Sequence, residues 1–122
     1  MLLDFWERFP QLFIVVKLGR RIAGYSITCV QGERAELASI AVDPLFQSQG
    51  VATAVMNYTT LRLRRRKVSK WTLMVRINNE RAIRFYRHFG FARTRTVRKY
   101  YEDSTDAWRM EAKVESIKRR SA

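Results

Sequence analysis

The chain has 122 residues, of which 47% are hydrophobic and 29% are charged. This composition is typical of a globular protein rather than a disordered chain, and we expect residues 1–122 to form one domain. The longest apolar run, Leu12–Val16, is far shorter than the ~20 residues of a membrane-spanning helix. Asp4 and Glu7 make the N-terminus unlike a secretory signal.

Basic residues outnumber acidic ones by 24 to 11, which gives a formal net charge of +13. Such a surface attracts polyanions, and charge alone does not distinguish nucleic acid, the ribosome and a phosphate-rich cofactor. Cys29 is the single cysteine and His88 the single histidine. They provide neither a disulfide nor a set of metal ligands, so we expect no metal and a cytoplasmic location, where thiols stay reduced.

The first half of the chain is dominated by strand patterns. Residues 2–9 look like the end of a short amphipathic helix that stops near Pro10. Alternating apolar residues separated by glycine turns then predict an antiparallel meander of three strands, at residues 12–18, 22–30 and 35–42.

The second half mixes helices and strands. Apolar spacing predicts helices at 51–67 and 80–89, the second with Asn78 or Asn79 as N-cap and Gly90 after its end. Trp71, Leu73 and Val75 alternate in a further strand, and two more strands are expected at 94–101 and 107–114. The order β-β-β-α-β-α-β-β predicts an α+β fold.

The segment Val42–Ala52 ends a strand and opens a helix, and from Gln47 it carries the pattern Q-x-x-G-x-A. A helix N-terminus has unpaired N–H groups and a positive dipole, and Gly50 permits close approach of backbone to an anion. Such a turn can hold a pyrophosphate, but the pattern taken alone favours an ordinary strand–turn–helix junction.

Further motifs accompany this turn: N-x-x-A-I-x-x-Y from Asn79 to Tyr86, then Gly90-Phe91 and Tyr100-Tyr101. Together they make residues 12–114 resemble the GNAT N-acetyltransferase superfamily, above all the branch that acetylates protein N-terminal amines. The resemblance implies a mixed, mostly antiparallel central sheet with helices on both faces. The family usually begins with a strand and a helix that this chain is expected to lack, which implies either a late start or a missing wall of the peptide groove.

The resemblance also implies acetyl-CoA as cofactor. In the family the turn binds the pyrophosphate, the strand before it pairs with the pantetheine arm, and the later Asn and Tyr contact the cofactor. The corresponding residues here are Ile40, Ala41, Val42, Gln47, Ser48, Gln49, Gly50, Val51, Ala52, Thr53, Asn79 and Tyr86.

Catalytic roles follow from the same resemblance. Tyr86 is the expected general acid. The family's general-base Glu corresponds to Met74, which cannot accept a proton; Glu36 is the expected substitute, unless it is an exposed carboxylate paired with an Arg. Tyr100 and Tyr101 are expected to line the acceptor site, the alternative being one core and one exposed aromatic.

The expected function is direct transfer of acetyl, in a ternary complex, from acetyl-CoA to a primary amine, above all the N-terminal α-amine of a ribosomal or nascent protein. Two alternatives stay open: a lysine or small-molecule amine as acceptor, or a basic ribosome- or RNA-binding module without catalysis. The expected partners are a protein N-terminus and, through the basic surface, the ribosome. The chain is expected to be a monomer or homodimer, without a membrane partner.

Overall fold

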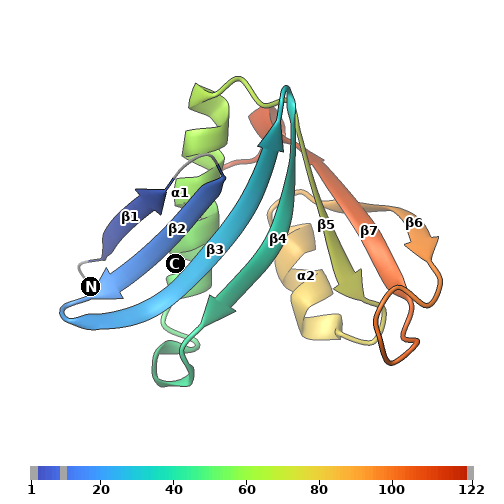
Figure 1. Ribbon diagram of the computed structural model, residues 1–122, viewed down its shortest axis with the longest axis horizontal. Coiled ribbons are helices and arrows are strands. Elements are labelled where there is room, and N and C mark those ends of the chain that lie inside the picture. The colour runs from blue at the N-terminus through green and yellow to red at the C-terminus, as the bar shows by residue number, and fades with distance from the viewer. Residues whose placement is uncertain (1–2, 9–10, 121–122) are drawn as a thin grey trace.

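The computed structural model describes residues 3–8 and 11–120. Seven strands form one sheet in the order β1-β2-β3-β4-β5-β7-β6, in which β4 and β5 are the parallel neighbours (Figure 1). The strands are β1 (Asp4–Arg8), β2 (Leu12–Leu18), β3 (Arg21–Gln31), β4 (Arg34–Val42), β5 (Lys70–Arg76), β6 (Ala92–Val97) and β7 (Ala107–Lys113). The helices are α1 (Val51–Arg65), α2 (Glu80–His88) and two short 3-10 helices, η1 (Pro44–Phe46) and η2 (Val114–Ser116). The expected mixed, mostly antiparallel α+β architecture is confirmed.

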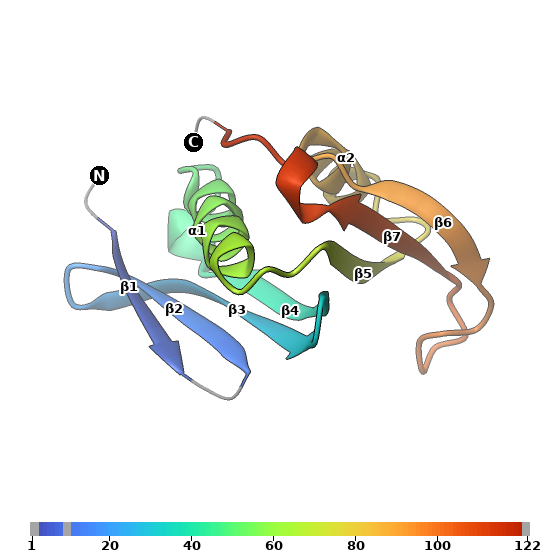
Figure 2. The ribbon, with the colours of Figure 1, turned by 90° about the horizontal axis from the view of Figure 1, so that it is seen from above.

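Both α-helices lie on the same face of the sheet (Figure 2). The strand residues that point to this face are buried, as the alternation of Leu12, Ile14 and Val16 in β2 shows. On the opposite face, Phe13 and Ile22 are exposed. The expectation of helices on both faces is therefore wrong for the described residues, because α1 and α2 both bury their apolar sides against one core. None of the helices in these segments is long and apolar enough to cross a membrane.

The expected helix at residues 2–9 is also wrong, because β1 is an edge strand paired antiparallel with β2. Phe5 stacks on Tyr58 of α1 with 4.3 Å between ring centroids, and Glu7 forms an ion pair with Arg62 of α1. Asp4 and Trp6 point away and are exposed. Successive side chains therefore point to opposite faces, which is the pattern of a strand. A strand thus precedes the meander; residues 2 and 9–10 lie outside the described part.

The other boundaries agree with the expected ones to within about two residues, except in β6. That strand ends at Val97 rather than at residue 101, so Tyr100 and Tyr101 lie in the loop 98–106. The Asp106 carboxylate accepts a hydrogen bond from the Lys99 N–H (2.9 Å), and the Tyr101 N–H donates to the Thr105 carbonyl (3.2 Å). These bonds fold the chain back on itself and end the strand.

The sheet opens between its two parallel strands. β4 and β5 are paired only from Arg34–Lys70 to Leu37–Leu73, after which they diverge (Figure 1). At the same level Ala38 is a bulge residue, because Leu37 pairs with Thr28 of β3 and Ser39 with Ile27. A bulge bends its strand and redirects backbone groups, a common device beside active sites. The divergence creates the space in which the candidate site lies.

Candidate active site

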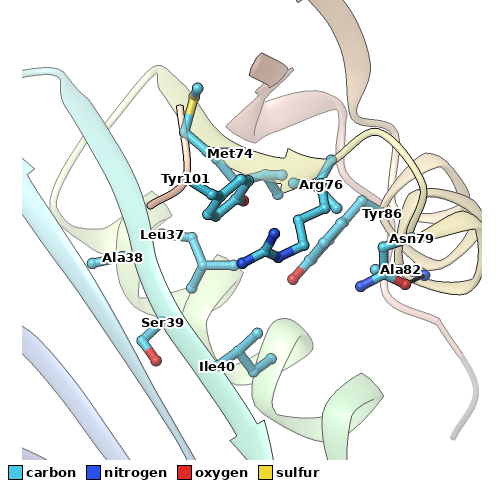
Figure 3. A pocket seen from close by; sticks show the side chains of 12 residues that line it. Leu37, Ala38, Ser39, Ile40, Met74, Arg76, Asn79, Ala82, Tyr86 and Tyr101 are labelled. Atoms are coloured by element: carbon cyan, nitrogen blue, oxygen red, sulfur yellow. Dashed lines mark hydrogen bonds between the residues drawn. The ribbon is translucent and has the colours of Figure 1, made fainter. Parts of the chain in front are cut away.

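A cavity of about 260 Å³ lies where β4 and β5 diverge. One wall comes from residues 37–40 of β4 and the other from residues 73–76 of β5. Asn79, Ala82 and Tyr86 close the cavity from the side of α2, and Tyr101 closes it from the loop 98–106 (Figure 3). Four of the residues expected from the sequence thus meet here: Ile40, Asn79, Tyr86 and Tyr101.

The turn before α1 carries most of the expected cofactor contacts, and it does not line this cavity. Ser48 and Gly50 both have positive φ, 64° and 80°, which curls the backbone between η1 and α1. Gly50 is the N-cap of α1 and makes no side-chain capping hydrogen bond, and the first helical turn contains no acidic residue. The turn therefore supplies N–H donors, a positive helix end and no opposing negative charge, which fits a pyrophosphate.

The remaining residues expected to bind the cofactor lie in the chain between the cavity and the first turn of α1. Ala41 and Val42 follow Ile40 in β4, beyond the cavity. Gln47 precedes the turn, and Val51, Ala52 and Thr53 form the first turn of α1. A coenzyme A molecule is long enough to need both a diphosphate cradle and a narrow channel. The residues present fit acetyl-CoA in that respect.

Asn79, rather than Asn78, is the N-cap of α2. Its side-chain oxygen accepts a hydrogen bond from the Ala82 N–H at 3.2 Å. This bond fixes the start of the helix at the rim of the cavity, where Asn79 is one of the lining residues (Figure 3). The position of Tyr86, two helical turns further along, follows from that start.

Tyr86 is the most strongly perturbed titratable group of the cavity. Only 8% of the residue is exposed, and burial, with a smaller contribution from Tyr101, raises the pKa of its hydroxyl to about 12. The phenol therefore keeps its proton throughout the physiological range. A protonated hydroxyl that points into a small cavity is suited to donate a proton to a leaving group.

Arg76 enters the cavity beside Tyr101, and sequence reasoning did not select it (Figure 3). Its guanidinium lies 4.1 Å from the centroid of the Tyr101 ring and binds both Asp103 oxygens, at 3.0 and 2.8 Å. The Asp103 pKa falls to about 2, chiefly through hydrogen bonds from Thr105 and Arg76. Burial raises the Tyr101 pKa, and Arg76 opposes that shift.

The two expected acceptor tyrosines differ. Tyr101 lines the cavity. Tyr100 is 49% exposed and packs edge-on against the Tyr101 ring, with 5.0 Å between the ring centroids.

The expected base lies apart from the cavity lining. Glu36 is exposed on the uncovered sheet face and pairs in register with Cys29 and Thr72. Met74, two residues after Thr72 and on the same face, does line the cavity. Within the described residues, no carboxylate lines the cavity.

Comparisons with known proteins place this geometry in a family. Residues 1–91 match the model of the acetyltransferase (GNAT) family. The ribosomal protein bS18 alanine N-acetyltransferase of Escherichia coli is 37% identical over 86 residues, which are 70% of this chain and 57% of that enzyme. An N-acetyltransferase of Methanocaldococcus jannaschii is 30% identical over 110 residues, 88% of this chain and 69% of the relative.

The fold agrees with the sequence match. The crystal structure of the ribosomal protein S18 alanine N-acetyltransferase from Escherichia coli superimposes with a TM-score of 0.82 and 32% identity, covering 88% of this chain and 72% of that one. The α+β fold and these matches thus define an acyltransferase that uses acetyl-CoA as cofactor. The chain belongs to the acetyltransferase (GNAT) family.

Proposed function

We propose that residues 1–122 act as one catalytic domain that transfers acetyl from acetyl-CoA to the N-terminal α-amine of a protein. The main support is the cavity between β4 and β5, which is lined by the buried phenol of Tyr86 together with Met74, Arg76 and Tyr101. The Escherichia coli relative, whose name states an alanine N-terminus of a ribosomal protein as substrate, supports the choice of acceptor. Acetyl-CoA supplies an activated acetyl thioester.

The cofactor is held by backbone rather than by charge. Residues 47–53 present N–H groups to its diphosphate. Ile40, Ala41 and Val42 of β4 pair with β3 but no longer with β5, and this open edge binds the extended arm as an added strand would. Binding of the arm along a fixed path positions the acetyl end beside Tyr86 without further ordering. With acetyl-CoA on this path, backbone N–H groups at the Ala38 bulge would stabilise the charge that develops on the carbonyl oxygen.

Two proton transfers remain for side chains. The Tyr86 Oη donates its proton to the departing sulfur. Glu36 accepts the proton of the acceptor amine through water, since it does not line the cavity itself. Tyr100 and Tyr101 form the side of the acceptor site that faces the loop 98–106.

The acceptor is tested with matched peptides. A peptide that begins with alanine and contains one internal lysine is compared with its N-terminally blocked copy, and mass spectrometry locates the acetyl group. We expect modification of the α-amine alone, hence none of the blocked peptide. Acetyl on the lysine of both peptides would contradict the proposed acceptor.

A lysine or small-molecule amine is the second candidate acceptor, and Met74 favours it. In the N-terminal branch that the sequence resembles, this position holds the general base, so its loss here is compatible with a different amine. Acetyl on the internal lysine would select a lysine acceptor. Release of coenzyme A with a small polyamine, and with neither peptide, would select a small-molecule amine.

Thermal unfolding with and without acetyl-CoA distinguishes an acetyltransferase, whichever amine it accepts, from a basic binding module without catalysis. Acetyl-CoA at 100 times its Kd adds ~2.7 kcal/mol of stability to a protein that binds it. A module without cofactor binding shows no shift. A cytoplasmic site of action follows from the proposed acceptor, a ribosomal or nascent protein.

A further inference from the structure

A second and larger hollow runs along the outer side of α1, away from the cavity. Its volume is about 1170 Å³. Its lining includes Leu3 and Phe5, residues of α1, and residues 117–120, which follow η2. In Figure 2, α1 lies between β1 and the segment that follows η2. We call it the α1 groove. Neither the chemistry proposed above nor the cavity uses it, except that Ser48–Gly50 form one end.

The C-terminal segment is fixed in place rather than loosely attached. The Asn57 side chain donates to the Arg120 carbonyl (2.8 Å) and accepts from the Arg120 N–H (3.0 Å). Arg64 of α1 donates to the carbonyls of Val114 and Ile117. These bonds hold three consecutive cations, Lys118, Arg119 and Arg120, at the border of the groove.

The charge of the groove is of one sign. Arg64, Lys118, Arg119 and Arg120 line it, and no acidic residue does so among the described residues. Lys118 and Arg119 are exposed, while the Arg120 Nε is buried without a hydrogen-bond partner in the described part of the chain. A buried guanidinium nitrogen without an acceptor favours an anionic ligand over a mere solvated surface.

Aromatic side chains occur in the same groove. Phe5 and Tyr58 both line it and stack on one another with an interplanar angle of 5°. A basic groove that also offers aromatic surface is the arrangement by which proteins bind single-stranded nucleic acids, whose bases stack while cations follow the phosphates. An acidic peptide would use the cations and leave the aromatic pair without a role.

We propose that the α1 groove binds single-stranded RNA. This inference concerns a surface other than the acetyl-transfer cavity, and the groove shares only Ser48–Gly50 with the turn that the proposed reaction uses. RNA binding there places the cavity beside a ribonucleoprotein acceptor, which is the kind of substrate that a ribosomal protein represents.

The test is a fluorescence anisotropy titration of the full chain with a labelled single-stranded RNA of about 12 nucleotides, a length within the usual site sizes. The variant Lys118→Ala/Arg119→Ala removes two exposed cations whose side chains form no hydrogen bond within residues 3–8 and 11–120. We expect roughly tenfold weaker binding, and a plot of log K against log salt that is shallower by ~1.4, or ~0.7 for each lost phosphate contact.

The matched control is Arg95→Ala/Arg98→Ala, which removes two exposed cations at β6 and in the loop after it. We expect this variant to bind like the wild type. Equal weakening by both variants would show diffuse attraction by the net charge of +13 and would overturn the proposed site.

Three further measurements keep the result interpretable. Tyr58→Leu should weaken binding roughly tenfold through lost stacking, whereas Tyr58→Phe should not. A polyglutamate peptide that binds as tightly as RNA, or saturating coenzyme A that displaces the RNA completely, would overturn the proposal. Acetylation of a short peptide by Lys118→Ala/Arg119→Ala should equal that of the wild type, so failure of RNA binding and failure of the reaction are separate outcomes.

Discussion

The two walls of the cavity are built from different parts of the chain. The β4 wall consists of Leu37, Ala38, Ser39 and Ile40, none of them charged, beside a bulge that exposes main-chain groups. The β5 wall consists of Leu73, Met74, Val75 and Arg76, of which Met74 and Arg76 have long side chains, with Tyr101 from a loop beside it. One wall thus offers backbone, and the other offers side chains.

This difference suggests a division of labour. Backbone geometry is little affected by substitution, which suits a ligand that never changes, such as acetyl-CoA. Side chains on a strand end and a hairpin loop change readily with sequence, which suits an acceptor that differs among relatives. Tyr86 of α2 lies where the two walls meet, and in the proposed reaction it serves the step in which both ligands take part.

The largest effect is expected where the walls meet. Tyr86→Phe removes the donor hydroxyl while keeping the ring packed against Phe91, so kcat should fall ~10²–10⁴-fold. The Kd for acetyl-CoA should change little, because the cofactor wall is untouched. Stopped assays of coenzyme A release, with calorimetry for the Kd, measure both.

The pH profile sharpens this assignment. An acid must be protonated to act, and the raised pKa of about 12 keeps Tyr86 protonated at every lower pH. Activity should therefore not decline between pH 8 and 10 through this group. A decline there that Tyr86→Phe abolishes would contradict its role as a buried acid, and unchanged kcat in the variant would remove it from the mechanism.

The next largest effect concerns Glu36, on the uncovered sheet face outside the cavity lining. Glu36→Gln should lower kcat/KM roughly tenfold or more near neutral pH and shift the activity optimum upward, because the acceptor amine must then lose its proton to solvent. Glu33→Gln, another exposed carboxylate nearby in the chain, is the control. A profile identical to the wild type would reduce Glu36 to a surface residue.

Local signals explain which parts of this fold could be predicted. The helices were found because their apolar spacing and the Asn79 cap are encoded within a few residues. β1 was mistaken for a helix because its five residues fix no period; its pairing with β2 and the Phe5–Tyr58 stack decide its conformation. Arg76 was overlooked because its partner Asp103 lies 27 residues further along the chain. Contacts between distant segments therefore account for the differences.

The backbone wall can be tested at Gly50, whose φ of 80° disfavours any side chain. Gly50→Ala should raise the Kd for acetyl-CoA roughly tenfold, since the strain of ~1–2 kcal/mol falls on the diphosphate turn. Gly32→Ala is a matched control, because Gly32 has a φ of 61° in a hairpin turn with open space around it. Both variants should lose stability, but only Gly50→Ala should lose cofactor affinity; equal affinities would contradict the assigned role of the turn.

The smallest effect is expected on the side-chain wall. Arg76→Lys removes the planar guanidinium, whose Nη1 contacts both Asp103 oxygens and which stacks on Tyr101. KM for the peptide should therefore rise roughly two- to fivefold while the Kd for acetyl-CoA stays constant. Asp103→Asn should act in the same direction, and Arg98→Lys, an exposed cation in the same loop, should not.

The pH dependence of this ion pair follows from Asp103. Its pKa in the folded chain is about 2, below the ordinary 3.8, so the carboxylate is charged at every pH above that range and the pair is lost only as the pH falls towards 2. KM for the peptide should thus show no contribution from this pair between pH 5 and 8. If Arg76→Lys instead weakened cofactor binding more than peptide binding, Arg76 would belong to the cofactor side, and the division between a backbone wall and a side-chain wall would fail at the residue on which it most depends.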